Sequence, residues 1–427
     1  MEQAVDNRRE TLFLYSIPYS MAASCFGGVA IGPLRHTGAI WIATVFFGIL
    51  LIALKRGRQV TFPVLVWAPF YSFMGISLLW GGFDYRDNIQ LYVQYLAFPV
   101  VGIVASYTIR NVEFVRKINI HFVIAIGIIG LFCVYYTVGP GRHYVDPKSS
   151  LYQGFADRPA ATSLIVVASI FLAQYHRSKT ISILVWLLCF GICLLSASRM
   201  ATVVLLGLWL IHPRLASIQS RLFMSAAVVL IGLAAFNTPI IQDRFFTKKY
   251  GFKGKGTIED VMEGKFDSAG RFETWPKVIE KSGDAPWFGH GVGESTPFIL
   301  SIWSHMDKPH NEYLKMLYEG GATGLSLFLL GMIGTLGNLW WNLAKTGQTN
   351  WVTSAAIMGW VGFILMAIVD NPLVYGNNFL HPLFMLVGAA NGITYQWLQD
   401  KNAAGVNVSE ERGLSRGRYV PRPIPMR

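Results

Sequence analysis

The chain has little charge for its length. Of 427 residues, 14% are Asp, Glu, Lys or Arg, 53% are hydrophobic, and the mean hydropathy is +0.41. A soluble core does not need so many apolar side chains, and runs of about 18 or more apolar residues are long enough to cross a bilayer. The composition therefore excludes an ordinary soluble protein of two or three domains and predicts a polytopic membrane protein.

Cysteine is scarce as well. The four cysteines all lie in apolar runs: Cys25, Cys133, Cys189 and Cys193. Cys189 and Cys193 are one helical turn apart, where two thiols rarely reach disulfide geometry. The hydrophilic stretch from about Thr238 to Pro309 has none, so its fold does not depend on disulfides.

The positive charge is not concentrated in one patch. The net charge is +12, but Lys and Arg occur in short clusters between apolar runs. This pattern is typical of segments that attach to anionic lipid head groups. We therefore predict membrane lipids as partners and no nucleic acid.

Twelve apolar segments are interpreted as membrane-spanning helices. They lie near 12–31, 37–54, 60–80, 89–109, 118–138, 159–175, 181–196, 200–212, 222–237, 312–343, 351–369 and 378–398. A single helix over 181–212 would be about 48 Å long, whereas the apolar core of a bilayer is about 30 Å thick. Basic residues flank both ends of that stretch, which favours a hairpin turning near Ser198 and Arg199.

Twelve spans place both termini in the cytoplasm and the long hydrophilic stretch outside. The short outer loops carry fewer Lys and Arg than the inner segments, as the positive-inside rule requires. We divide the chain into 1–237 with nine helices, 238–311 as an outer loop or lid, 312–398 with three helices, and 399–427. The last segment is basic, lacks periodicity and is expected to be a disordered cytoplasmic tail.

The lid is expected to be partly helical. Residues 257–266 have the pattern of a short amphipathic helix, and Ser268 could cap a second helix that runs through Arg271, Trp275 and Ile279. Its first turn would then present free N–H groups beside the Arg271 guanidinium, which suits a phosphate. The alternative is an ordinary solvated pair of Arg271 with Glu273 or Asp267.

Two further residues have the chemistry of a site. Arg199, at membrane depth, either binds an anion with its planar guanidinium or extends to the outer head groups. His310 stands where the chain re-enters the membrane, and an imidazole can accept a proton from a hydroxyl nucleophile. A lone histidine at a helix start is more often a capping or interface residue.

Other polar groups near His310 have simpler explanations. Gly320, Gly321 and Gly324 are expected to allow close helix packing rather than to bind phosphate. Lys315 and Glu319 are one turn apart and are expected to neutralise each other. His305, Asp307 and His310 could be drawn as a metal cluster, but their spacing is irregular and Lys308 intrudes, so we predict no metal.

An additional basic group lies between the fifth and sixth segments: Arg142, His143, Lys148 and Arg158. It could guide an anionic head group to a site at the outer face. It could equally be a basic interfacial loop.

Three motifs together resemble the O-antigen ligase and polymerase superfamily of bacterial envelope glycosyltransferases. Ser196–Arg199 is similar to its Ser-x-Ser-Arg motif, and Gly270–Trp275, followed by Gly289–Gly291, to its loop arginine motif. His310–Leu314, with Glu319 and Gly324, is similar to its His-Asn-x-x-Leu signature, the most specific of the three. The resemblance covers roughly residues 150 to 390.

This resemblance implies an all-α membrane fold of the GT-C glycosyltransferase type in the bacterial inner membrane, with about 12 helices. One large, partly helical periplasmic loop would lie between helices 9 and 10, and the active site would face the periplasm. The donor would be an undecaprenyl-diphosphate-linked glycan and the acceptor lipid A–core. Arg199 and Arg271 would hold the diphosphate and His310 would be the base, with no metal or cofactor. Apart from the resemblance, we predict that Arg142, Arg158, His290, Asn311 and Tyr313 contact the substrate.

Three alternatives stay open. Polymerisation of repeat units and transfer to protein Ser or Thr need the same donor and the same activated hydroxyl. A secondary transporter is the alternative from another class, since twelve spans are common there. The single long insertion between spans nine and ten, without two matching halves of six helices, argues against transport.

Overall fold

The computed structural model describes most of the chain, with gaps. The residues described are 8–24, 30–31, 34–55, 57–81, 86–137, 158–195, 198–212, 218–237, 242, 246, 256–257, 259–260, 263, 270–303, 308–347, 350–374 and 376–404. Most of the predicted helix at 257–266 lies outside these residues. All of the basic tail after 404 lies outside them as well.

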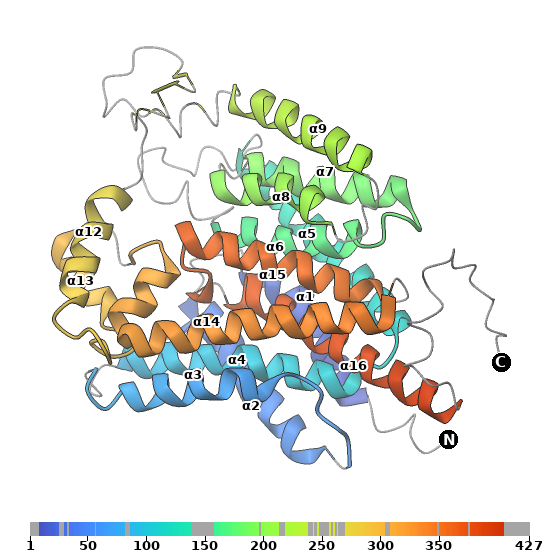
Figure 1. Ribbon diagram of the computed structural model, residues 1–427, viewed down its shortest axis with the longest axis horizontal. Coiled ribbons are helices and arrows are strands. Elements are labelled where there is room, and N and C mark those ends of the chain that lie inside the picture. The colour runs from blue at the N-terminus through green and yellow to red at the C-terminus, as the bar shows by residue number, and fades with distance from the viewer. Residues whose placement is uncertain are drawn as a thin grey trace.

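Each of the twelve predicted apolar segments contains a helix (Figure 1). In chain order they are α1 (Arg8–Ser24), α2 (His36–Leu54), α3 (Val64–Ser77), α4 (Arg86–Thr108), α5 (Val112–Thr137), α6 (Arg158–Leu172), α7 (Lys179–Leu195), α8 (Arg199–Ile211), α9 (Ile218–Phe236), α14 (Glu312–Thr346), α15 (Trp351–Val369) and α16 (His381–Ala403). The lid contributes α12 (Arg271–Ser282) and α13 (Ser295–Ile302), and two short turns, η6 (Pro372–Val374) and η7 (Gly376–Leu380), precede α16.

The protein is an α-helical membrane protein. Among the described residues, four stretches are long and apolar enough to cross a membrane: Asp87–Thr108, Val112–Phe132, Glu312–Thr346 and Trp351–Val369. Six further apolar helices are shorter, so the count of twelve spans stays a prediction. One small departure from an all-α fold is a two-residue antiparallel pair, β1 (Ala30–Ile31) with β2 (Leu34–Arg35).

The predicted hairpin near Arg199 is present. Helix α7 ends at Leu195, and α8 begins at Arg199. Trp186 donates its Nε1–H to the carbonyl of Leu205 at 3.0 Å, and its ring meets Trp209 edge-on at 5.8 Å. Leu205 and Trp209 lie about as many residues after the turn between the two helices as Trp186 lies before it. The two helices therefore run antiparallel.

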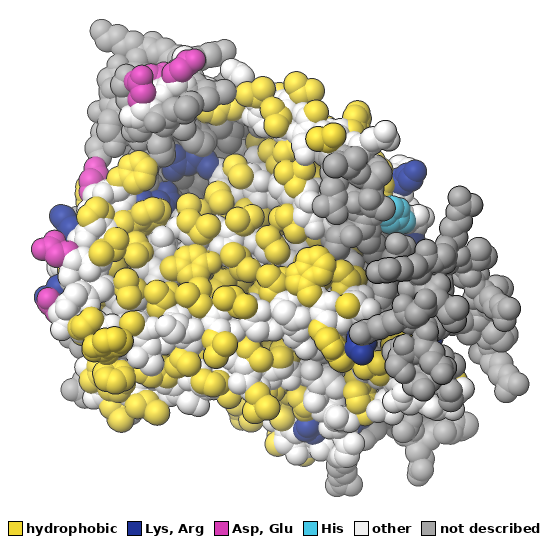
Figure 2. All heavy atoms as spheres, viewed as in Figure 1, with side chains coloured by type: hydrophobic (Ala, Val, Ile, Leu, Met, Phe, Trp, Pro, Cys, Tyr) yellow, Lys and Arg dark blue, Asp and Glu magenta, His cyan; other side chains and the backbone are white. Residues whose placement is uncertain are grey.

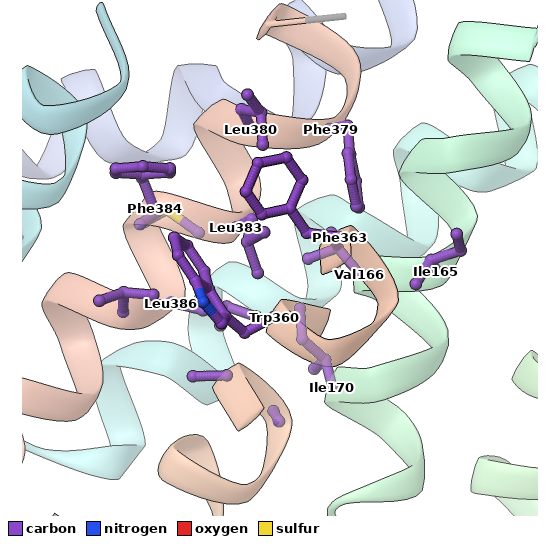
Figure 3. Close-up of a cluster of buried hydrophobic side chains, with 14 of the residues drawn as sticks. Ile165, Val166, Ile170, Trp360, Phe363, Phe379, Leu380, Leu383, Phe384 and Leu386 are labelled. Atoms are coloured by element: carbon purple, nitrogen blue, oxygen red, sulfur yellow. The ribbon is translucent and has the colours of Figure 1, made fainter. Parts of the chain in front are cut away.

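Helix α15 lies at the centre of the bundle. Figure 3 shows aromatic and aliphatic side chains of α6, α15, η7 and α16 packed together, including Ile165, Trp360, Phe379 and Phe384. Glycines bring some backbones into direct contact: a Cβ added at Gly388 of α16 would lie 2.2 Å from the carbonyl oxygen of Gly102 in α4. Small residues at such crossings are the usual device of helix packing in membranes.

Figure 2 shows the outer surface that results. Hydrophobic side chains cover the middle of the face, and acidic side chains gather at the end occupied by α12 and α13. The end of α16 lies at the opposite end of the molecule (Figure 1). An apolar band between two more polar ends is the surface expected of a protein that sits in a bilayer.

Helix α14 is broken at Gly321. This residue has φ 63° and ψ −163°, a conformation that is essentially restricted to glycine. The break leaves Tyr318 and Glu319 with free carbonyls and Ala322 and Thr323 with free N–H groups. Residues 322–346 alone form a helix of about 37 Å, which is long enough to cross the bilayer.

The lid loop fills this break. The amides of His290 and Gly291 donate to the carbonyls of Tyr318 and Glu319 at 2.9 and 2.8 Å. In return, Ala322 and Thr323 donate to the carbonyls of Pro286 and Trp287 at 2.8 and 3.1 Å. The lid is thereby attached to a membrane helix by four backbone hydrogen bonds.

Replacing Gly321 with Ala should detach this part of the lid. The added Cβ would lie 2.5 Å from the carbonyl carbon of Trp287, and a non-glycine residue at this φ and ψ costs about 1–3 kcal/mol. We expect lower thermal stability and faster hydrogen exchange over 286–291. Gly337→Ala is the matched control, since Gly337 of the same helix has nothing within 4 Å of an added Cβ. Equal behaviour of the two variants would contradict this role of Gly321.

Candidate active site

Helix α12 holds the start of the site in place. It begins at Arg271, and Gly270, at φ 78°, is its N-cap residue without a side-chain hydrogen bond. The prediction that Ser268 caps this helix is therefore wrong: glycine reaches the left-handed conformation at the turn into the helix more cheaply than other residues. The indole Nε1–H of Trp275 donates to the carbonyl of Pro309 at 2.8 Å, so α12 also fixes the chain just before His310.

A small separate core joins the lid to α14. Val278 of α12 and Ile299 of α13 are buried against Tyr318, with Phe298 and Leu314 packed around them. Leu314 is the leucine of the His-Asn-x-x-Leu motif. This packing explains why the leucine follows His310 by four residues: Leu314 lies in the first turn of α14, on the side that contacts the lid helices.

His310 has an unusual backbone. Among the described residues it is the only non-glycine with positive φ, at 51°. The chain is held on both sides of it: Pro309 accepts from Trp275, and Asn311 caps α14, its Oδ1 accepting from the Leu314 amide at 3.0 Å. A strained backbone kept in place by its neighbours is common at functional sites.

The imidazole of His310 has a carboxylate partner. Its Nδ1 lies 3.2 Å from Oδ1 of Asp370, and the two side chains are 15% and 6% exposed. The Asn371 amide donates to the same Asp370 oxygen at 2.9 Å, which orients the carboxylate. A carboxylate at Nδ1 favours the tautomer with the proton on that nitrogen, so Nε2 is the atom that can accept a proton.

Sequence reasoning missed Asp370. It lies 60 residues after His310, immediately after the last residue of α15. The available signal was a carboxylate that directly follows an apolar span predicted to end at the outer face. No local spacing links it to His310.

Arg271 reaches the same place. Its Nε donates to the carbonyl of Val369 at 3.1 Å, and Val369 is the neighbour of Asp370. The lid arginine and the histidine thus bind consecutive residues at the end of α15. The structure brings these two predicted site residues together.

Arg199 lies at the same end of the bundle. An added Cβ at Gly362 of α15 would contact Ile165 of α6 and Val204 of α8, and one at Gly359 would approach Ser169. Helix α6 therefore runs antiparallel to α15. Nε2 of His212, just after the end of α8, lies 2.8 Å from the carbonyl oxygen of Leu172 at the end of α6. Because the ends of the two helices meet, α8 runs parallel to α6.

The start of α8 is consequently near the end of α15. Arg199 is about 7.5 Å along the axis from Val204, and Val369 is about 10.5 Å from Gly362 at 1.5 Å per residue. Arg199, whose side chain is half-buried, therefore lies at about the same height in the bundle as the last turn of α15. Figure 2 shows Lys and Arg side chains gathered in a recess in this region, beside the lid helices.

The other predicted contact residues are placed differently. His290 stacks on Tyr318 at 4.4 Å, Asn311 caps α14, and the Tyr313 hydroxyl donates to the carbonyl of Ile364 at 3.0 Å. These three contacts are structural, and binding of substrate by the same residues stays a prediction. Arg142, His305 and Asp307 lie outside the described residues, as does the side chain of Arg158.

Fold and geometry together define a multi-helix membrane protein in which Arg271 and the His310–Asp370 pair meet at the end of α15, with Arg199 at the same end of the bundle. Residues 183–329 match the family model described as O-antigen ligase. That range includes Arg199, Arg271 and His310 and ends before Asp370. The resemblance to the O-antigen ligase family predicted from the motifs is confirmed.

One curated relative supports the same family. Over 138 residues the chain is 29% identical to an O-antigen ligase of Pseudomonas aeruginosa, in an alignment that covers 31% of this chain and 32% of that protein. The chain therefore matches about a third of the length of this relative.

Proposed function

We propose that this protein is an O-antigen ligase. It transfers a glycan from undecaprenyl diphosphate to a sugar hydroxyl of lipid A–core at the periplasmic face of the inner membrane. One observation carries the proposal: Arg271 and His310 bind the consecutive residues Val369 and Asp370, although they come from different parts of the chain. A cation and a base meet at the lid-covered end of α15, as a reaction with a diphosphate leaving group requires.

The chemistry is a single displacement. Nε2 of His310 accepts the proton of the acceptor hydroxyl while its oxygen forms a bond to the anomeric carbon. The bond from that carbon to the diphosphate breaks, and the diphosphate leaves with the bonding electrons. Asp370 orients the imidazole and stabilises its positive charge after the proton transfer. One displacement without a covalent intermediate inverts the anomeric centre.

Two arginines neutralise the leaving group. Negative charge grows on the diphosphate oxygens in the transition state, and guanidinium groups held in place can stabilise it. Arg271 is pre-oriented because its Nε donates to the carbonyl of Val369. Arg199 supplies the second cation. This arrangement needs no metal ion.

The membrane arrangement follows the same proposal. About twelve helices of the GT-C type place both termini in the cytoplasm and the lid in the periplasm. The end of α16 at the opposite end from α12 and α13 supports this orientation (Figure 1). The candidate groups lie at one end of the helices rather than at their midpoints, which argues against a secondary transporter.

Transfer by purified protein tests the function. In nanodiscs with an undecaprenyl-diphosphate-linked glycan, we expect product on lipid A–core when that acceptor is present. Longer glycans on the carrier would instead identify a polymerase, product on a peptide a protein glycosyltransferase, and counterflow of a labelled solute a transporter. Retention of anomeric configuration in the product would contradict the single displacement.

His310→Ala should lower the transfer rate by at least about 100-fold, since general-base catalysis contributes roughly 10²–10⁴. Expression, membrane insertion and thermal stability should stay close to those of the wild type. His176→Ala, at an exposed histidine away from the lid, is the control. A well-folded His310→Ala protein with normal activity would remove His310 from the mechanism.

Arg199→Lys should lower the rate by at least about tenfold, although the charge is kept. An ammonium cannot match the planar, two-pronged contact of a guanidinium with phosphate oxygens. Arg116→Lys on α5 is the matched control, because Arg116 pairs with the exposed Glu113. Full activity of Arg199→Lys at saturating and limiting donor would show that Arg199 does not clamp the diphosphate.

A further inference from the structure

A charged triad is buried in the first turns of α14. Glu312, Lys315 and Glu319 are 0%, 1% and 0% exposed. The Lys315 ammonium lies 3.7 Å from Oε1 of Glu312 and 3.8 Å from Oε2 of Glu319. The spacing of three and four residues places all three side chains on one face of the helix. The one-turn spacing predicts the Lys315–Glu319 pair, whereas the part played by Glu312 is visible only in the fold.

We propose that this triad is a positioning network for the base: Glu312 holds the turn that carries Asp370, and Lys315 and Glu319 connect that turn to the lid. The proposal deepens the proposed function, on which its catalytic meaning rests. None of the three residues needs to touch substrate.

Glu312 connects the two segments that form the His310–Asp370 pair. It is two residues after His310, and its Oε2 accepts from the amide of Leu373 at 3.1 Å. Leu373 is three residues after Asp370, in the turn η6, which the Val374 amide closes by donating to the carbonyl of Asn371 at 3.0 Å. The carboxylate thus fixes the distance between the chain at 310–312 and the chain at 370–373.

Glu319 connects the triad to the lid at two points. Its Oε1 accepts from the hydroxyl of Ser295, the first residue of α13, at 2.5 Å. Its backbone carbonyl accepts from Gly291 at the break in α14. A shift of α13 is therefore transmitted to the carboxylate that shares Lys315 with Glu312.

Lys315 is the residue on which both carboxylates depend. Oε1 of Glu312 and Oε2 of Glu319 are buried and make no hydrogen bond to the described residues. The Lys315 ammonium lies within 3.8 Å of both oxygens and is the cation that the two carboxylates share. Lys315 also donates to the hydroxyl of Tyr95 in α4. Buried charges without partners are costly, so losing Lys315 would destabilise both carboxylates.

Glu312→Ala and Glu312→Gln separate positioning from general stability. Gln keeps a side-chain oxygen that can accept from the Leu373 amide, whereas Ala has none. For Ala we expect kcat at least about tenfold lower with the donor KM within about twofold, because the base is misplaced while binding persists. For Gln we expect kcat within about threefold of the wild type. Hydrogen exchange at 370–374 should rise in Ala and stay near wild type in Gln.

The controls match the chemistry. Glu280→Gln, at an exposed site on α12, should change neither kcat nor exchange at 370–374. If Glu312→Ala does not fold, Ser295→Ala tests the lid end of the network, with faster exchange over 295–302 and reduced kcat expected. Ser301→Ala, an exposed serine of the same helix, is its control.

The outcomes are distinct. Wild-type kcat in Glu312→Ala, or a loss in Gln as large as in Ala, would overturn the proposal, as would faster exchange with unchanged kcat. If the wild-type protein transfers no glycan at all, the proposed function fails. The exchange measurements then still decide whether Glu312 holds the turn at 370–374.

Discussion

The break of α14 at Gly321 is the constraint on which the rest of the site depends. In a continuous helix, the carbonyls of Tyr318 and Glu319 and the amides of Ala322 and Thr323 would bond to each other. They would then not be available to the lid loop. With the break, four backbone hydrogen bonds join the lid loop to a membrane helix. Backbone contacts tolerate side-chain changes but not displacement, so the lid is held in register with the bundle.

Three distant segments then meet at the end of α15. The lid helix supplies Arg271, the link from lid to membrane supplies His310, and the turn after α15 supplies Asp370. Each is fixed by neighbours that do no chemistry: Trp275 holds Pro309, Asn311 caps α14, and Glu312 holds Leu373. Precision at a site on loops comes from such supporting contacts.

Some sequence predictions succeeded because their causes are local. The apolar runs contain helices, the chain turns back before Arg199, and Lys315 pairs with Glu319 one turn away. Others failed where a tertiary contact decides. Gly320 and Gly324 do allow close packing against Phe73, as expected, but Gly321 between them breaks the helix. Ser268 had a suitable capping side chain, but α12 starts after Gly270.

The sequence by itself determined the class of protein and indicated three candidate residues in its motifs, because hydropathy and the family resemblance are properties of short segments. Only the tertiary structure decided that Asp370 is the partner of His310 and that Glu312 reaches Leu373. These pairs are about 60 residues apart, and no periodicity connects them. They arise because α14 and α15 pack side by side, with the start of α14 at the level of the end of α15. That arrangement is a property of helix packing and not of any single segment.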